Sequence, residues 1–134
     1  MTEDESLRRY GLHPTGADLT DIRSMLAAET GRGVDGQDTD LMKLCCVQLF
    51  NAGQPGDILA IWRAKESSFD AHCGIDVHLL CGAGLDATRH HLAEQDSPDA
   101  AAALRYLREC EAAGDFDRFT VAAWSESYAH YYSA

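Results

Sequence analysis

Residues 62–78, near the middle of the chain, contain several charged side chains, two histidines, a thiol and a tryptophan. His72 and Asp76 are four residues apart, so on a helix they would share one face, where a carboxylate can orient an imidazole. In that arrangement His72 acts as a general base, Asp76 holds its ring, and Arg63 or Lys65 binds an anionic group. One hypothesis is therefore a small enzyme or ligand-binding domain with a polar site at Arg63, Asp70, His72 and Asp76.

The same residues also have a structural interpretation. Asp70 and Asp76 can cap helices, or pair with Arg63 and Lys65 across a helix junction and so fix the angle between two helices. Ion pairs at helix junctions are commoner than catalytic dyads. The chain contains no phosphate loop, nucleophile elbow or other catalytic motif. These observations favour a non-enzymatic role.

A metal site is the next class of chemistry to consider. His78 and Cys81 are three residues apart, and His90 and His91 follow soon after. Zinc sites usually show two pairs of closely spaced ligands, and this sequence offers one such pair. The adjacent His90 and His91 point to different sides of a helix. We expect neither a bound metal nor a cofactor.

The five cysteines are interpreted as reduced thiols. Their odd number leaves at least one unpaired, and adjacent Cys45 and Cys46 have poor geometry for an ordinary disulfide. Cys46 or Cys73 could act as a reactive thiol, and Lys43, three residues before Cys46, could lower the pKa of the Cys46 thiol. We expect four of the cysteines on or near buried faces: Cys45, Cys73, Cys81 and Cys110.

Tyrosine and tryptophan are enriched at binding hot spots, and this chain has both types in excess of what a small helical core needs. Trp62 is either part of the core, which we favour, or a contact residue. The tail carries Tyr128, Tyr131 and Tyr132 within five residues. We expect this tail to contact a protein partner or a second copy of the chain.

The net charge of −11 is distributed unevenly along the chain. Residues 1–40 contain nine acidic and four basic side chains, and residues 94–117 contain seven and two, whereas residues 41–93 are nearly balanced with five and four. The electrostatic field of this negative charge repels phosphate groups, so we expect no binding to nucleic acid or to anionic membranes. It favours a partner with a basic surface. Acidity that serves only to keep the chain in solution is the alternative.

The elements that position these residues are predicted to be helices. Apolar residues recur at helical spacing, prolines are few, and no alternating run is long enough for a strand. Residues 1–17 are expected to be a partly ordered lead-in, and residues 18–134 a single helical domain. About seven helices are expected, over residues 18–30, 39–52, 55–64, 68–81, 86–94 and 98–113, and from residue 117 onward.

Residues 40–49 and 76–85 are similar in sequence, with four identities at an offset of 36 residues. This offset and the expected hairpins 39–65, 68–94 and 97–130 resemble an α-solenoid of tetratricopeptide, ankyrin or HEAT style, although no signature residues of those repeats stand in register. The resemblance implies a compact right-handed stack of about three antiparallel helical hairpins. Chance similarity between two helices of like composition is the alternative.

The sequence contains no run of about 18 or more uncharged apolar residues, and its first residues are acidic. We therefore expect a cytoplasmic protein. The favoured hypothesis is a non-enzymatic protein–protein interaction module with an acidic surface, of an inhibitor, immunity or regulatory-adaptor type by analogy. A homodimer is compatible with the same features.

Overall fold

The computed structural model describes residues 1–133, and within this range it contains eight α-helices and no strand. The predicted all-α fold is confirmed. The α-helices are α1 (Glu3–Tyr10), α2 (Ala17–Arg32), α3 (Thr39–Ala52), α4 (Ile58–Lys65), α5 (Phe69–Gly74), α6 (Leu85–Glu94), α7 (Pro98–Ala112) and α8 (Val121–Tyr132). Two 3₁₀ helices, η1 (Pro55–Asp57) and η2 (Val77–Cys81), connect them.

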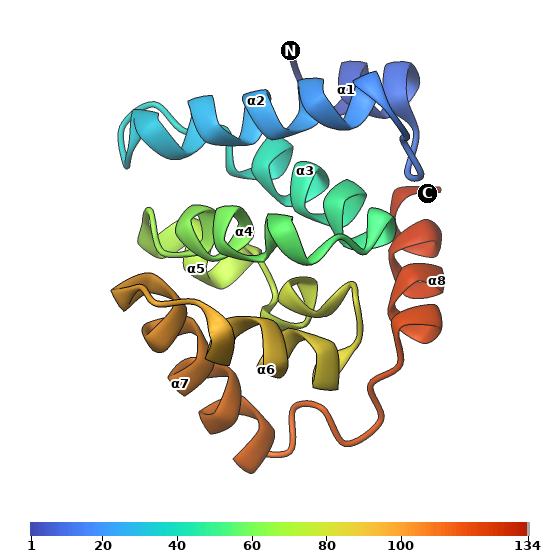
Figure 1. Ribbon diagram of the computed structural model, residues 1–134. Coiled ribbons are helices and arrows are strands. Elements are labelled where there is room, and N and C mark those ends of the chain that lie inside the picture. The colour runs from blue at the N-terminus through green and yellow to red at the C-terminus, as the bar shows by residue number, and fades with distance from the viewer. Residues whose placement is uncertain (134) are drawn as a thin grey trace.

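The helices form a compact stack, with α2 and α3 at one end, α4 and α5 in the middle, and α6 and α7 at the other end (Figure 1). Helix α8 stands along one side of this stack (Figure 1). In the part of the chain that the structure describes, no helix has both the length and the apolar character needed to cross a bilayer.

Side-chain caps set the starts of five helices. The side chains of Thr2, Asp38, Ser68, Ser97 and Thr120 each accept a hydrogen bond from the backbone N–H three residues further on. A free N–H at a helix start has no partner within the helix, so each cap fixes where its helix begins. These local signals explain why the predicted starts near residues 39, 68 and 98 are close to the observed ones.

Helix α3 forms the centre of the core. Its sequence is apolar around most of its circumference, and a helix of that kind is stable only when other helices cover it on several sides. Helix α2 covers one side of α3, and α1, α5, η2 and α8 cover the others. The fully buried side chains of α3 include Met42, Leu44, Cys45, Cys46, Val47, Gln48, Leu49 and Phe50.

The observed helix pairs differ from the predicted hairpins. The most extensive contacts join α2 to α3 and α6 to α7, and α4 also contacts α5. In the described chain α3 does not pack extensively on α4, nor α7 on α8, so the predicted hairpins 39–65 and 97–130 are wrong in their pairing, whereas within 68–94 η2 does contact α6. The physical reason is the apolar stripe of Leu19 and Ile22 on α2, which must be buried and is covered by α3.

The predicted helix over residues 68–81 is interrupted. Helix α5 ends at Gly74, Ile75 and Asp76 are extended, and η2 begins at Val77. Residues 40–49 therefore lie in a regular α-helix, whereas residues 76–85 form a 3₁₀ turn and the start of α6. The two similar segments adopt different structures, so their similarity does not identify a repeat.

Residues 1–17, predicted to be a partly ordered lead-in, contain helix α1. This helix was not predicted, and it brings the seven expected helices to eight. Gln48 of α3 donates a hydrogen bond to the carbonyl oxygen of Gly11 (2.8 Å), and Asn51 donates one to the carbonyl oxygen of Leu12 (2.7 Å). These amide side chains hold the segment that follows α1 against α3. They cannot be recognised from local sequence, because the partners are 37 and 39 residues apart.

Candidate functional site

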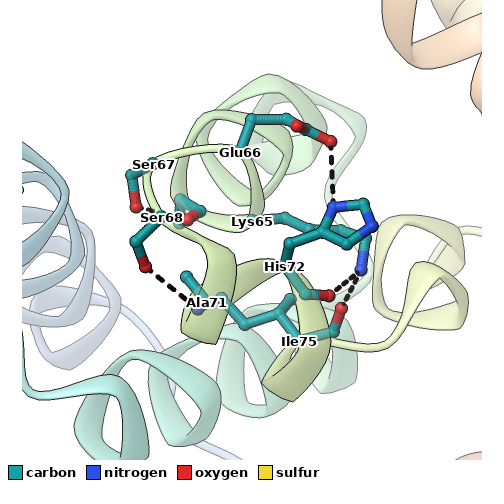
Figure 2. A network of polar contacts seen from close by, with 8 residues as sticks. Lys65, Glu66, Ser67, Ser68, Ala71, His72 and Ile75 are labelled. Carbon is teal, nitrogen blue, oxygen red and sulfur yellow. Dashed lines mark hydrogen bonds and ion pairs between the residues drawn. The ribbon is translucent and has the colours of Figure 1, made fainter. Parts of the chain in front are cut away.

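The polar segment singled out from the sequence forms the turn between α4 and α5, and its centre is a buried lysine. The Lys65 side chain reaches the C-terminal end of α5, and Nζ donates hydrogen bonds to the carbonyl oxygens of His72 and Ile75, both at 2.5 Å (Figure 2). These carbonyls lie at the C-terminal end of α5, where the helix leaves acceptors free, so Lys65 caps α5.

Burial has the expected effect on this amine. Desolvation lowers the pKa of Lys65, and the nearby carboxylates of Asp76 and Glu66 act in the opposite direction. Only 3% of the Lys65 residue surface is exposed, so the amine is not available to an external ligand. The predicted anion-binding role of Lys65 is therefore replaced by a structural one.

Three further side chains fix the turn. Ser67 donates to the carbonyl oxygen of Ala64 (2.6 Å), and Gln37, from the α2–α3 loop, donates to Ser67 Oγ (2.7 Å). Ser68 accepts from the backbone N–H of Ala71 (3.0 Å) and caps the start of α5 (Figure 2). Because both ends of α5 are capped and the turn is tied to a neighbouring loop, the position of α5 is closely defined.

His72 and Asp76 are not partners. Helix α5 ends between them, so the prediction that they share one helical face was wrong. His72 Nδ1 lies 3.3 Å from a carboxylate oxygen of Glu66, and its ring meets the ring of Tyr106 edge-on with centroids 5.6 Å apart. Asp76 instead accepts a hydrogen bond from the hydroxyl of Tyr128 (2.5 Å).

The remaining members of the predicted polar site point elsewhere. Arg63 pairs with Asp99 of α7 at 2.9 Å, with both side chains about half exposed, and Asp70 is exposed at the start of α5. The neighbouring hollow of about 430 Å³ is lined by Trp62, Glu66, Ala102, Arg105, Tyr106 and Glu109. Arg63, Asp70, His72 and Asp76 thus do not converge on one pocket, and this geometry gives the enzyme alternative no support.

The aromatic residues divide between the core and the surface. Trp62 is buried, with its ring 5.6 Å from that of Tyr106, and Tyr128 is buried against Phe50 with ring centroids 6.3 Å apart. Burial and the hydrogen bond to a carboxylate raise the pKa of Tyr128. The favoured core position of Trp62 is confirmed, whereas Tyr128, expected as a contact residue of the tail, also belongs to the core.

The end of the tail is accessible. Tyr131 is 59% exposed, and the amine of Lys43 lies 4.8 Å from the centre of its ring, at a distance typical of a cation–π contact. Tyr132 is half-buried, and burial raises the pKa of its hydroxyl, with further contributions from Glu3 and Asp40. Tyr131 is therefore the tail tyrosine that presents its ring outward.

Four acidic residues gather where α1 and α3 begin. We call Glu3, Asp4, Asp38 and Asp40 the carboxylate cluster. Helices α1 and α3 contact each other, so the four residues lie in one region of the molecule. Partial burial raises the pKa of Glu3, the negative charges of Asp40, Asp4 and Asp38 raise it further, and the positive charge of Lys43 lowers it. The positive ends of the two helix dipoles stabilise these charges. Within residues 1–133 no ion pair joins the cluster to a basic side chain within 4 Å.

The reactive thiol predicted at Cys46 is not formed. Cys46 is fully buried, and burial raises its pKa well above the ordinary value, so the proximity of Lys43 in sequence does not activate it. Lys43 contacts Tyr131 instead. Cys73, the other candidate thiol, was expected on or near a buried face but is exposed.

The histidines and Cys81 serve separate roles. His78 Nε2 donates to the carbonyl oxygen of Asp115 (2.7 Å), His90 lies 2.6 Å from Glu94, and Cys81 is buried. Over residues 1–133, no three His, Cys, Asp or Glu side chains come together in a way that could hold a metal ion.

Two exposed apolar side chains were missed by the sequence analysis. Phe69 is 79% exposed and Val34 is 78% exposed. The predicted helix over residues 68–81 is interrupted, so its spacing does not determine which of its apolar side chains are buried. Ser68 was the residue in the sequence from which the exposure of Phe69 could have been predicted. Because Ser68 caps α5, Phe69 is the first helical residue and lies at the edge of the stack.

Comparisons of this chain with protein-family models, curated proteins and solved structures gave no match, so the functional argument depends on the chain's own residues.

Proposed function

We propose that the protein is a non-enzymatic interaction module that binds a protein partner with a basic surface. The observation that carries this proposal is the carboxylate cluster at the starts of the contacting helices α1 and α3, where Asp4 and Asp40 are exposed. Among the described residues no ion pair within 4 Å joins the cluster to a basic side chain. Tyr131 lies against α3, since the amine of Lys43 is 4.8 Å from the centre of its ring. An exposed tyrosine next to unpaired carboxylates is a suitable surface for a basic protein.

The second acidic segment is a weaker candidate surface. Within residues 94–117, Asp99 pairs with Arg63 and Glu111 pairs with Arg89. These pairs cancel part of the charge that the sequence assigns to the segment. The carboxylate cluster therefore supports the proposal better than residues 94–117 do.

A partner bound in this way would be held partly by long-range attraction, which steers association and weakens with salt. The same charge opposes binding to nucleic acid and to anionic membranes. An inhibitor, immunity protein or regulatory adaptor acting in the cytoplasm is the class of role that this proposal favours, by analogy of size and charge.

The test is reversal of two charges that do not cap a helix. The double variant Asp4→Lys/Asp40→Lys changes two exposed members of the carboxylate cluster and leaves the Asp38 cap in place. Isothermal titration calorimetry would use the polypeptide that co-purifies with the wild-type protein from its own host. We expect affinity to fall about 10-fold or more, mainly through slower association.

The matched control is Asp96→Lys/Asp117→Lys, which reverses two exposed charges in the other acidic segment. This control should change affinity by less than about threefold if the carboxylate cluster is the contact surface. Equal losses in the two double variants would show a general charge effect and contradict the proposed surface. Unchanged affinity in both would contradict the role of acidity altogether.

A further inference from the structure

We infer that Phe69, supported by Val34, is an apolar anchor that inserts into a pocket with a basic rim on the partner. This inference rests on the proposed function and adds the chemistry of the partner's contact site. We call Val34, Asp35, Phe69 and Asp70 the Phe69 edge.

Phe69 contributes little to the fold. Its side chain is 79% exposed, and within the described chain its ring meets no other aromatic ring. A phenylalanine left in water gains none of the free energy that burial of its ring would supply. A polar residue at this first helical position would satisfy the fold equally well, so the aromatic ring is explained better by a binding role than by stability.

The ring is also held ready for binding. Ser68 caps the helix start directly before Phe69, and Lys65 caps the other end of the same short helix. Gln37 ties Ser67 to the loop that carries Val34. Because the backbone on both sides of Phe69 is fixed, binding would order little more than the phenyl ring itself, which limits the entropy lost on association.

The charges around the anchor specify the partner. Each exposed apolar residue is followed directly by an exposed aspartate, Asp35 after Val34 and Asp70 after Phe69. The nearby Arg32 is paired with Glu29 and does not offset them. The hydrogen bond from Gln37 to Ser67 joins the loop that carries Val34 and Asp35 to the segment that carries Phe69 and Asp70. An apolar ring with carboxylates on its own helix and on the adjoining loop complements an apolar pocket surrounded by lysine or arginine side chains.

The Phe69 edge continues into the carboxylate cluster. Asp38 belongs to the cluster and follows Gln37, whose side chain reaches Ser67 next to the anchor. One basic partner surface could therefore cover the α2–α3 loop together with both groups of acidic side chains. A second copy of the chain is a poor occupant, because a symmetric contact through this edge would bring the same carboxylates against one another.

The experiment compares Phe69→Ala with Phe69→Leu, using the co-purified and separately expressed polypeptide as the titrant. We expect Phe69→Ala to weaken binding about 30-fold or more, as for a hot-spot residue, and Phe69→Leu to retain part of the affinity. The control Leu104→Ala truncates a partly exposed apolar side chain on α7 and should leave affinity nearly unchanged. Thermal melting should show the same Tm for Phe69→Ala and wild type.

The possible results distinguish failure of the Phe69 anchor from failure of the proposed function. Normal binding by Phe69→Ala, with weakened binding by Asp4→Lys/Asp40→Lys, would overturn the anchor and leave the acidic surface in place. A wild-type homodimer that Phe69→Ala dissociates would also overturn it, because the occupant would then be a second copy. If no polypeptide co-purifies and the chain is a monomer, the proposed function fails and the anchor fails with it.

Discussion

Lys65 shows how a single side chain can decide local structure in this protein. A buried ammonium group loses hydration, and the lowered pKa of Lys65 reports that loss. Its compensation is the pair of 2.5 Å hydrogen bonds to His72 and Ile75, which fill acceptors that α5 leaves free. The residue that resembled an anion-binding group in the sequence is thus a helix cap.

We predict that Lys65→Met destabilises the fold by about 1–3 kcal/mol, because two carbonyl groups near the core lose their donor. Urea unfolding followed by circular dichroism measures this difference. The control Lys43→Met removes an amine that contacts a partly solvated ring and should change stability by no more than about 0.5 kcal/mol. A stabilised Lys65→Met variant would mean that desolvation of the ammonium outweighs its hydrogen bonds.

The members of the predicted polar site were identified correctly as a cluster in sequence, but their partners could not be predicted. His72 contacts Glu66, Asp76 contacts Tyr128, and Arg63 contacts Asp99. Two of these three partners lie on other helices, and helical spacing carries no information about them. The exposure of Phe69 was missed because it depends on where α5 ends, which helical spacing alone does not show.

At the scale of the elements, the approach of η2 to α3 depends on one glycine. A Cβ atom built on Gly82 would lie 2.3 Å from the carbonyl oxygen of Phe50, which no side chain can occupy without movement of the backbone. Gly82 has an ordinary helical φ, so space and not backbone conformation requires glycine here. The need for glycine at this position comes from a tertiary contact, which the local sequence does not show.

We predict that Gly82→Ala destabilises the protein by about 1–3 kcal/mol through this overlap. Gly74→Ala is the matched control, because a Cβ there would meet no atom within 4 Å and the residue is helical. The control should be neutral or stabilising by up to about 1 kcal/mol. Differential scanning calorimetry of the two variants tests the contrast, and equal Tm values would show that η2 shifts to accept the methyl group.

Helix starts were largely predictable, whereas helix pairing was not. Asp38 and Ser97 announce their helices by side-chain capping, which depends on residues within three positions. Pairing depends on which apolar faces meet. For example, α8 contacts α3 through a hydrogen bond that the Ser125 hydroxyl donates to the Asn51 side-chain oxygen, 74 residues away in sequence. The all-α class therefore follows from the sequence, but the arrangement of the stack does not.

At the scale of the whole molecule, the core keeps several weak acids neutral. Burial raises the pKa of Cys45 and Cys81 from 9.0 to about 12, and that of Tyr106 from 10.0 to about 12. In the unfolded chain these groups ionise at their ordinary values. Their contribution to stability is therefore complete below about pH 9 and is lost as the pH rises toward 12.

We predict a Tm that is nearly constant from pH 7 to about 9 and then falls steadily, measured by circular dichroism in the presence of a reductant. Lys65 acts in the opposite direction, because its folded pKa lies below 10.5, but it is one group against several. Cys45→Ala removes one buried thiol and should make the fall less steep. A Tm that rises between pH 9 and 11 would contradict this account of the core.

The most direct test of the central claim is native mass spectrometry of the protein purified gently from its own host. The account predicts a second polypeptide with a basic surface bound to the chain, released by increasing salt before either component unfolds. A monomer or homodimer that carries a small molecule or a metal ion, with no second polypeptide at any salt concentration, would contradict the account and indicate a ligand-binding protein.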